Sequence, residues 1–344
     1  MALFVFWTAS GALAGDTEVS IDTQDPQVVL AGTLSMPEGE AEDLPGVVLL
    51  TGSGPQDRDS TIFGQTPLKV LAEAFVERGY AVLRCDDRGV GASVGSMEGA
   101  TIDDFVNDAR AMVKFLSVQE GVDWKKVFVV GHSEGAGVAA ELAASGDVHA
   151  GVVFLGGTAV PGHEVLTDQS VRLLEAMGLG ERGEAVRTAH RALMEALLDG
   201  ADEGRVLDLT TELVVAQTGG ALPEAFARMQ AEQAAGQFEG AWFRSFLEHD
   251  PSRAIRKMSV PGLALFGSLD QQVSDELNAG PMADALAAMR EPLSRVVVMP
   301  GRNHLFQRAR TGGLDEYAQL DDLDPDVAEA IADWMDDVLE SRDR

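Results

Sequence analysis

One stretch of this sequence constrains the fold more than any other: a buried strand runs into a glycine-flanked turn and then into a helix of small residues. The pattern predicts the strand over residues 126–130, the turn Gly-His-Ser-Glu-Gly over 131–135 and the helix over 134–144. A serine in so sharp a turn has a strained backbone, so the positions two before and two after it need glycine. Its hydroxyl then projects above the edge of a sheet, where the helix N-terminus also points its N–H groups.

Apolar runs alternate with segments of helical period on both sides of this turn. Such alternation is typical of a doubly wound, mostly parallel α/β sheet with helices on both faces. The sequence predicts strands over 28–36, 46–51, 81–84, 126–130, 151–155, 262–266 and 294–299, and helices over 67–78, 102–116, 134–144 and 326–339.

The alternation stops between about residues 161 and 250. This segment is rich in Ala, Glu, Leu and Met, and residues 165–177 and 185–198 carry apolar side chains at helical spacing. We therefore expect a helical cap, 161–250, inserted after about the sixth strand of one α/β domain formed by 15–160 and 251–344.

The charge of the chain limits its partners. The 344 residues include 56 acidic and 26 basic side chains, which gives a net charge of −30. A field of this sign repels phosphate backbones and anionic lipid headgroups, so nucleic acid is excluded as a partner. The surplus of acidic side chains predicts a soluble protein. Whether it also reflects adaptation to high salt is left open by the sequence.

Cysteine and histidine usage argues against a metal. The single Cys85 cannot form an internal disulfide, and the six histidines show no zinc-binding spacing. Cys85 ends a predicted strand and is expected to be a small core residue. We predict neither a metal nor a cofactor.

The first 14 residues are apolar and end in Ala-Leu-Ala, which resembles an export signal with its cleavage site, although no Lys or Arg precedes the apolar run. If they are a signal, the protein is periplasmic or extracellular, and otherwise it is cytoplasmic. No later stretch reaches the ~18 apolar residues of a spanning helix, so we expect no stable membrane insertion of the mature chain.

Two residues are candidates to activate Ser133. In folds with this turn the chain order is nucleophile, acid, histidine. His304 lies in the loop after the last predicted strand, and Asp270 lies just past the strand over 262–266. The competing acid, Asp275, is expected to cap a helix that begins near residue 276.

A glycine-rich loop after the strand over 46–51 predicts the rest of the site. Its backbone can approach a ligand closely, and we expect the N–H of Ser53, with Gly54 as the alternative, to act with the N–H of Glu134 on a developing oxyanion. We interpret the turn over 85–91 as structural, because its single Gly-x-Gly lacks the rest of a dinucleotide fingerprint. Candidate pocket residues, each also explicable as core or loop, are Gln56, Met177, Met194, Met229, Trp242, Phe243 and Phe246.

Together these segments resemble the α/β-hydrolase superfamily, and within it bacterial carboxylesterases related to serine aminopeptidase-like and dienelactone hydrolase-like enzymes. The similar segments are 51–59, 84–93, 131–135, 249–251, 260–270, 301–307 and 316–317. The resemblance implies an α/β-hydrolase fold and a triad of Ser133, Asp270 and His304. It further implies a small-molecule ester substrate, with short to medium acyl chains, cleaved through an acyl-enzyme. His249 stands where that group has an aromatic residue.

Two other functions remain open at this point. The same triad could cleave peptides or amides, and a hydrolase fold can also serve as a non-catalytic binding protein. Dehalogenase chemistry is disfavoured because it uses a carboxylate where Ser133 stands. The natural substrate and the oligomeric state are left open by the sequence.

Overall fold

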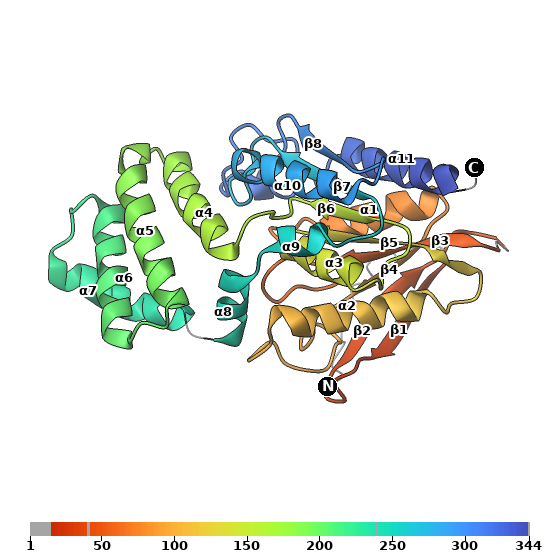
Figure 1. Ribbon diagram of the computed structural model, residues 1–344, viewed down its shortest axis with the longest axis horizontal. Coiled ribbons are helices and arrows are strands. Elements are labelled where there is room, and N and C mark those ends of the chain that lie inside the picture. Colours follow the sequence, from red (N-terminus) through yellow and green to blue (C-terminus); the bar gives the residue numbers. More distant parts are fainter. Residues whose placement is uncertain (1–14, 40–41, 239, 343–344) are drawn as a thin grey trace, which may run out of the picture.

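The computed structural model describes residues 15–39, 42–238 and 240–342. The expected export signal, residues 1–14, lies outside the described residues. Figure 1 shows a sheet flanked by helices, with a group of helices extending from one end of it.

The sheet has eight strands in the order β1-β2-β4-β3-β5-β6-β7-β8. β1 and β2 pair antiparallel, as do β2 and β4, and every pairing from β4 to β8 is parallel. The strands are β1 (Asp16–Asp22), β2 (Val29–Ser35), β3 (Leu44–Leu50), β4 (Ala81–Cys85), β5 (Val122–His132), β6 (Val152–Leu155), β7 (Gly262–Gly267) and β8 (Arg295–Met299). The predicted doubly wound α/β fold is confirmed.

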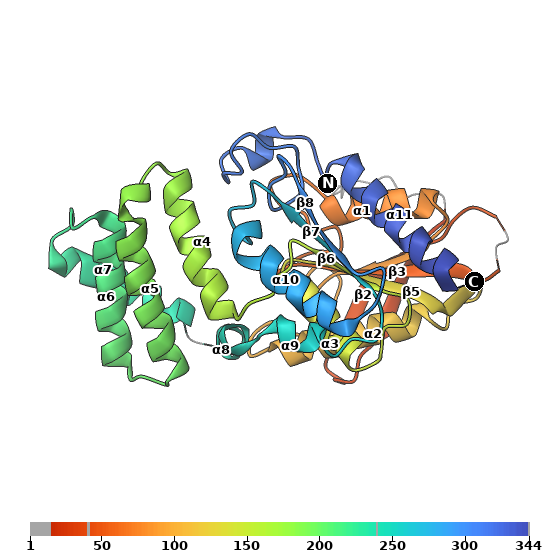
Figure 2. The ribbon, with the colours of Figure 1, turned by 45° about the horizontal axis from the view of Figure 1, so that its top comes forward.

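Helices cover both faces of this sheet (Figures 1 and 2). One face packs on α1 (Pro67–Glu77) and α11 (Pro325–Arg342). The other packs on α2 (Ile102–Leu116), α3 (Glu134–Ala144) and α10 (Asp275–Met289). Because side chains alternate along a strand, Val47 and Leu49 of β3 enter the first layer and Val48 enters the second.

Two strands differ from the expectation. β1 was not predicted, because only Ile21 of its seven residues is buried and its polar residues give no apolar pattern. β5 begins at Val122, four residues before the predicted start, and its first residues are partly exposed. The register of the β3–β5 pair shifts between Leu44 and Gly46, so the early part of β5 lies beyond an irregularity.

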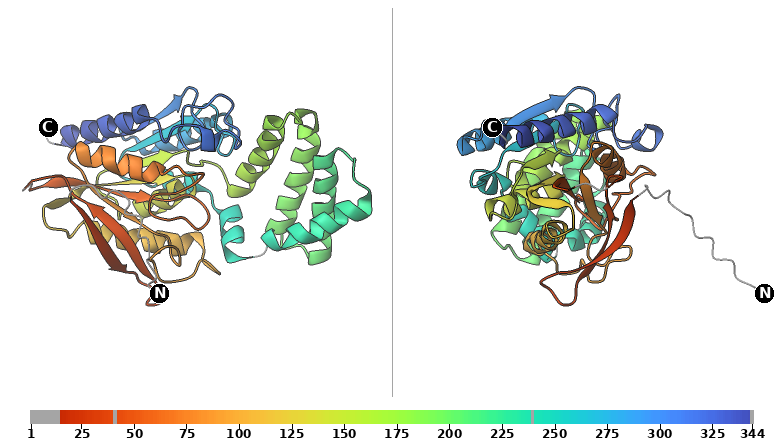
Figure 3. Two further views of the ribbon diagram at one scale, coloured as in Figure 1. Left: turned by 180° about the vertical axis from the view of Figure 1, so that it is seen from behind. Right: turned by 90° about the vertical axis from the view of Figure 1, so that its right-hand side faces the viewer.

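Between β6 and β7 the described residues form helices and no strand. They are α4 (Gly162–Ala176), η1 (Gly180–Arg182), α5 (Gly183–Leu198), α6 (Glu203–Thr218), α7 (Glu224–Ala235), η2 (Gly236–Phe238), α8 (Ala241–Glu248) and α9 (Pro251–Ile255). Helices α4 to α7 project from the end of the sheet (Figure 3). Helices α4, α5 and α6 share with α8 an apolar core that includes Val186, Leu193 and Leu213, and α7 packs on α6 through Ala227 and Ala231. A further short helix, η3 (Tyr317–Gln319), precedes α11.

Polar contacts join α4 and α8 to the α/β domain. They include Trp242 Nε1 to Glu134 Oε1 at 2.7 Å, Ser274 Oγ to Asp168 Oδ2 at 2.6 Å, Arg172 to Glu276 at 2.7 Å and His249 Nε2 to Glu141 Oε1 at 3.1 Å. A side chain on Gly137 would lie 2.9 Å from the His249 ring, so this glycine makes room for the histidine. His249 thus packs directly on α3 where an aromatic residue was expected.

Cys85 is buried at the end of β4, and burial raises the pKa of its thiol to about 12, as suits a core residue. Across residues 15–39, 42–238 and 240–342, no helix combines the length and apolar character needed to cross a bilayer. Within the same ranges, no group of three or more His, Cys, Asp or Glu side chains is arranged to hold a metal ion.

Candidate active site

The three predicted triad residues follow three parallel strands. Ser133 follows β5, Asp270 lies three residues beyond β7, and His304 lies in the loop after β8. β5, β6, β7 and β8 are successive neighbours in the sheet. Their carboxyl ends therefore meet at one edge, and the sheet brings together residues that are up to 171 positions apart (304 − 133).

The turn at Ser133 has the strained geometry that its sequence predicts. Ser133 has φ 54° and ψ −117°, a conformation that a non-glycine residue rarely adopts. A Cβ on Gly131 would lie 2.2 Å from the carbonyl oxygen of Gly135, and one on Gly135 would lie 2.3 Å from that of Thr51. Both glycines are therefore required by the close approach of backbone to backbone.

Asp270 and His304 form a buried pair. His304 Nδ1 lies 2.8 Å from Asp270 Oδ2, and the two residues are 4% and 3% exposed. The other carboxylate oxygen of Asp270 accepts backbone N–H groups from Gln272 and Val273, each at 2.8 Å. The carboxylate is thus fixed on both sides, and it holds the imidazole with Nε2 free to accept a proton.

Asp275, the competing acid, lies at the start of α10. It is the first residue of α10, and the N-cap is Ser274, whose hydroxyl accepts the N–H of Leu277. The expectation that Asp275 caps this helix is wrong by one residue, because the serine side chain reaches the first-turn amide. Asp275 contributes only an acidic side chain to the first turn.

Two amides that the sequence analysis missed shape the loop of His304. Asn303 is fully buried, and its Oδ1 accepts the N–H groups of Leu305 at 3.1 Å and Gln307 at 3.0 Å. Asn303 Nδ2 donates to Gln307 Oε1 at 2.8 Å, and Gln307 Nε2 donates to the carbonyl of Tyr317. The only sequence signal for this bracing was an amide residue on each side of the histidine.

The loop of His304 lies against the turn of Ser133. His132 Nε2 is 2.9 Å from the carbonyl oxygen of His304, and the two imidazole rings are 4.8 Å apart. In the described part of the chain, the Ser133 hydroxyl makes no hydrogen bond to His304. Catalytic hydrogen bonds are often long without substrate and tighten when it binds.

The glycine-rich loop after β3 passes directly beside the nucleophile. A Cβ on Gly52 would lie 3.3 Å from the Cβ of Ser133, so only a glycine permits this approach without displacement. Ser53 and Gly54 follow at once. Glu134, the other expected donor, is the first residue of α3, where a backbone N–H has no partner within the helix.

Carboxylates of the turn after β4 hold this loop in place. Asp87 accepts the Thr51 hydroxyl at 2.6 Å and the N–H of Gln56 at 2.9 Å. Arg58 makes a bidentate pair with Asp86 at 3.0 and 2.9 Å. The interpretation of residues 85–91 as a structural turn is in keeping with these contacts.

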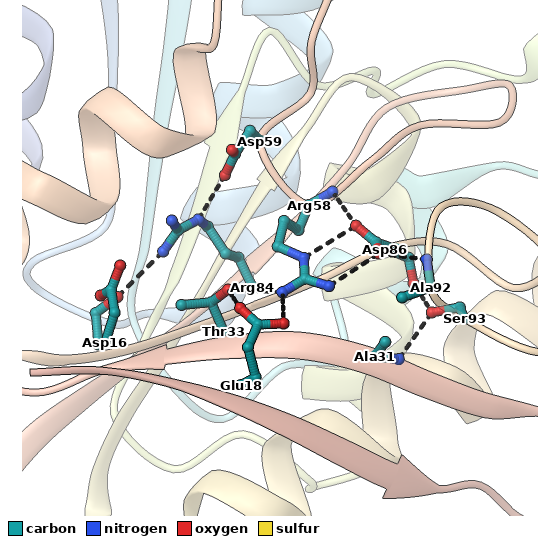
Figure 4. A network of polar contacts seen from close by, with 11 residues as sticks. Asp16, Glu18, Ala31, Thr33, Arg58, Asp59, Arg84, Asp86, Ala92 and Ser93 are labelled. Carbon is teal, nitrogen blue, oxygen red and sulfur yellow. Dashed lines mark hydrogen bonds and ion pairs between the residues drawn. The ribbon is translucent and has the colours of Figure 1, made fainter. Parts of the chain in front are cut away.

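Figure 4 shows how the bracing continues into the antiparallel edge of the sheet. Arg58 also reaches Glu18 of β1 and Thr33 of β2, while Arg84 of β4 pairs with Asp59 at 2.7 Å. Strands β1 and β2 therefore stabilise the loop beside Ser133, although they lie at the far edge of the sheet.

A cavity of about 60 Å³ opens beside the turn that carries Ser133. Its lining includes Gly52, Gly54, Asp87 and Glu134. Burial raises the pKa of Glu134 to about 7, although the hydrogen bond from Trp242 opposes the shift. Burial likewise raises the pKa of Asp87 to about 6, against its hydrogen bonds with Thr51 and Gln56. Both carboxyls therefore titrate near neutrality.

The Glu134→Gln variant is expected to be more stable than the wild type at pH 8, by about 3 kcal/mol, because the pKa of Glu134 rises from 4.5 to about 7 on folding and each pKa unit is worth ~1.4 kcal/mol. In the wild type the folded pKa is raised, so stability falls as pH rises from the unfolded value of 4.5 to about 7. The glutamine of the variant cannot ionise and can still accept the Trp242 N–H. Urea unfolding at pH 5 and pH 8 measures the difference, which should shrink to about 1 kcal/mol or less at the lower pH.

The control for this variant is Glu203→Gln, because Glu203 is likewise the first residue of a helix but is exposed. It should show no comparable gain at pH 8. A Glu134→Gln protein less stable than the wild type at pH 8 would contradict the burial argument.

The expected pocket residues divide into three groups. Met194, Trp242 and Phe243 line a cavity of about 340 Å³ among the projecting helices, and Phe246 stacks on Trp242. Gln56 braces the glycine-rich loop, because its amide donates to the carbonyl of Ser53 and accepts from Ser60. Two methionines lie at the surface: Met177 is 72% and Met229 46% exposed.

The sheet order and the likeness to solved structures show that the chain has the α/β-hydrolase fold. Residues 67–198 match the family described as serine aminopeptidase, S33. Esterase EstD of Thermotoga maritima is 27% identical over 311 residues, which are 89% of this chain and 65% of that protein. The chain thus spans less than two thirds of this relative.

Solved structures show the same fold. The α/β hydrolase GrgF from a Penicillium species aligns with a TM-score of 0.55 and 18% identity, over 93% of this chain and 97% of that one. Est1E from Butyrivibrio proteoclasticus, solved with ferulic acid bound, aligns with a TM-score of 0.54 and 17% identity, over 94% and 99%. The similarity covers nearly the whole chain.

Proposed function

We propose that this protein is a serine hydrolase that cleaves carboxylic esters through Ser133, His304 and Asp270. The observation that carries the proposal is the buried His304–Asp270 pair, 2.8 Å apart, at the same sheet edge as a serine held in a strained turn. Strain at such a residue is retained where a fold needs the side chain in one position. The similarity to an esterase over 89% of the chain supports the same reaction.

In the proposed reaction, Ser133 Oγ attacks the ester carbonyl and its proton passes to His304 Nε2. Asp270 keeps the proton of His304 on Nδ1 and stabilises the imidazolium. Backbone N–H groups of Glu134 and of Ser53 or Gly54 bind the oxyanion. The imidazolium then protonates the leaving alcohol, and a water molecule, activated in the same way, hydrolyses the acyl-enzyme.

We place the acyl group toward the cavity lined by Trp242 and Phe243. Its volume of about 340 Å³ is at the lower end of the ~300–1,000 Å³ typical of ligand pockets, which favours short to medium chains. Trp242 joins this cavity to the nucleophile, because its indole donates to Glu134 next to Ser133. A maximum rate with long-chain esters would argue against this placement.

An aminopeptidase is the second candidate, favoured by the family match over residues 67–198. Two carboxyls beside the nucleophile, Asp87 and Glu134, make no ion pair with an arginine of the described chain and could face a substrate amine. Comparing the kcat/KM of aminoacyl naphthylamides with that of p-nitrophenyl esters separates the two functions. Faster turnover of the amides would reverse the assignment.

A fluorophosphonate probe is expected to label the protein once, on Ser133, and to abolish ester hydrolysis in proportion to labelling. The physical reason is that only a serine with an adjacent general base attacks such a probe at a useful rate. Peptide mass spectrometry locates the adduct. An unlabelled protein that is still folded would favour the non-catalytic alternative, and an adduct on another serine would displace Ser133.

A further inference from the structure

His132 is a buried histidine that the proposed reaction does not use. We propose that it is a positioning residue: its Nε2–H donates to the backbone carbonyl of His304 and fixes the general base against the strand that carries the nucleophile. This inference rests on the proposed roles of Ser133 and His304.

The geometry of the contact defines the state of the ring. His132 Nε2 lies 2.9 Å from the carbonyl oxygen of His304, and His132 is 7% exposed. A carbonyl oxygen only accepts hydrogen bonds, so Nε2 must carry the proton. The two rings are 4.8 Å apart and inclined by 47°, so the imidazole of the base also rests on that of His132.

This bond supplies a restraint that the other contacts of His304 do not. Asp270 fixes the imidazole from the end of β7, and Asn303 braces the loop within itself. The bond from His132 instead ties the loop to β5, one residue before Ser133. Since displacement of a catalytic group by ~1 Å can cost about 100-fold in rate, a direct link between base and nucleophile has a large expected effect.

The surroundings of His132 keep its ring neutral. Burial and the nearby His304 together lower the pKa of His132 to about 4, while the hydrogen bond to the His304 carbonyl and the charge of Asp270 oppose the shift. On its other side the ring packs on the loop backbone, since a Cβ on Gly52 would lie 3.3 Å from Nδ1. A neutral ring does not oppose the positive charge that His304 acquires during the reaction.

Two substitutions separate the hydrogen bond from the shape of the side chain. His132→Phe keeps a flat ring but has no donor, and His132→Gln offers an amide donor at a similar reach. We expect kcat for a p-nitrophenyl ester to fall about 10- to 100-fold in the Phe variant, with KM unchanged, because His132 touches no substrate. The Gln variant should stay within about threefold of the wild type.

The matched control is His149→Phe, because His149 also packs on another ring, that of Trp124, but at the opposite end of β5. Its kcat should equal that of the wild type. The inference is overturned if the Phe variant keeps the wild-type kcat, or if the Gln and Phe variants are both folded and lose activity equally.

A measurement on the unmodified protein covers the case in which a variant does not fold. Nitrogen-15 NMR of the histidine rings should show His132 neutral and protonated at Nε2 between pH 5 and pH 8. The Nδ1-protonated tautomer would overturn the inference. If the proposed function itself were wrong, the wild type would hydrolyse no ester and take up no fluorophosphonate. That result is distinct from finding the Nδ1-protonated tautomer of His132.

Discussion

Ser133→Ala is expected to lower kcat for p-nitrophenyl acetate by about 10⁵- to 10⁶-fold, with little change in KM. In the proposed reaction the Ser133 Oγ forms the acyl-enzyme. The Ala variant would retain only the oxyanion donors and substrate binding, which by themselves give ~10³–10⁴-fold over water. The variant should fold, because alanine fits wherever serine does, and its melting temperature should lie close to that of the wild type.

The matched control for this loss is Ser145→Ala. Ser145 ends the same helix, α3, whose first residue follows Ser133, and it is exposed. Its removal should leave kcat unchanged. Retained turnover in Ser133→Ala, with the protein shown to be free of wild-type contamination, would require another nucleophile.

Asp270→Asn is expected to lower kcat by about 10⁴-fold while the protein stays folded. The wild-type carboxylate accepts the Nδ1–H of His304 and two backbone N–H groups. An amide can satisfy that arrangement only by turning its NH₂ group toward His304, which favours the tautomer with Nδ1 as acceptor. Nε2 then carries the proton and cannot take one from Ser133.

The competing carboxylate provides the control for this second prediction. Asp275→Asn should change kcat by less than about threefold, since Asp275 lies in the first turn of α10 and His304 bonds to Asp270. A larger loss in Asp275→Asn than in Asp270→Asn would reverse the assignment of the acid. Stopped-flow measurement of both acylation and deacylation would show the Asp270 effect on each step.

The parts of this site that follow from local sequence could be predicted. The glycines at 131 and 135 predict a turn whose backbone contacts leave no room for a side chain at either position. The chain order of Ser133, Asp270 and His304 matches the order of the strands that they follow in the sheet. Strand β1 escaped prediction because it lies at the edge and buries only Ile21. β1 contributes to the bracing of the loop beside Ser133 through Glu18, which accepts a hydrogen bond from Arg58.

Contacts between distant side chains could not be predicted. Trp242 and Glu134 are 108 residues apart, and nothing in either segment indicates the indole-to-carboxylate bond. The bond from the Gln56 amide to the carbonyl of Ser53 was likewise not indicated by either residue. The brace at Asn303 depends on a polar residue being fully buried, which only the packing of the loop reveals.

The bond between Ser274 and Asp168 has a consequence for enzyme engineering. Asp168 lies on α4, whereas Ser274 is the N-cap of α10, four residues after Asp270. Asp168 also holds Arg172 at 2.8 Å. A chimera that exchanges residues 161–250 for the corresponding segment of another hydrolase would therefore disturb the loop that positions the acid, unless it retains an acceptor at position 168. Exchanging residues 161–250 to change the substrate range is thus expected to change the turnover rate as well.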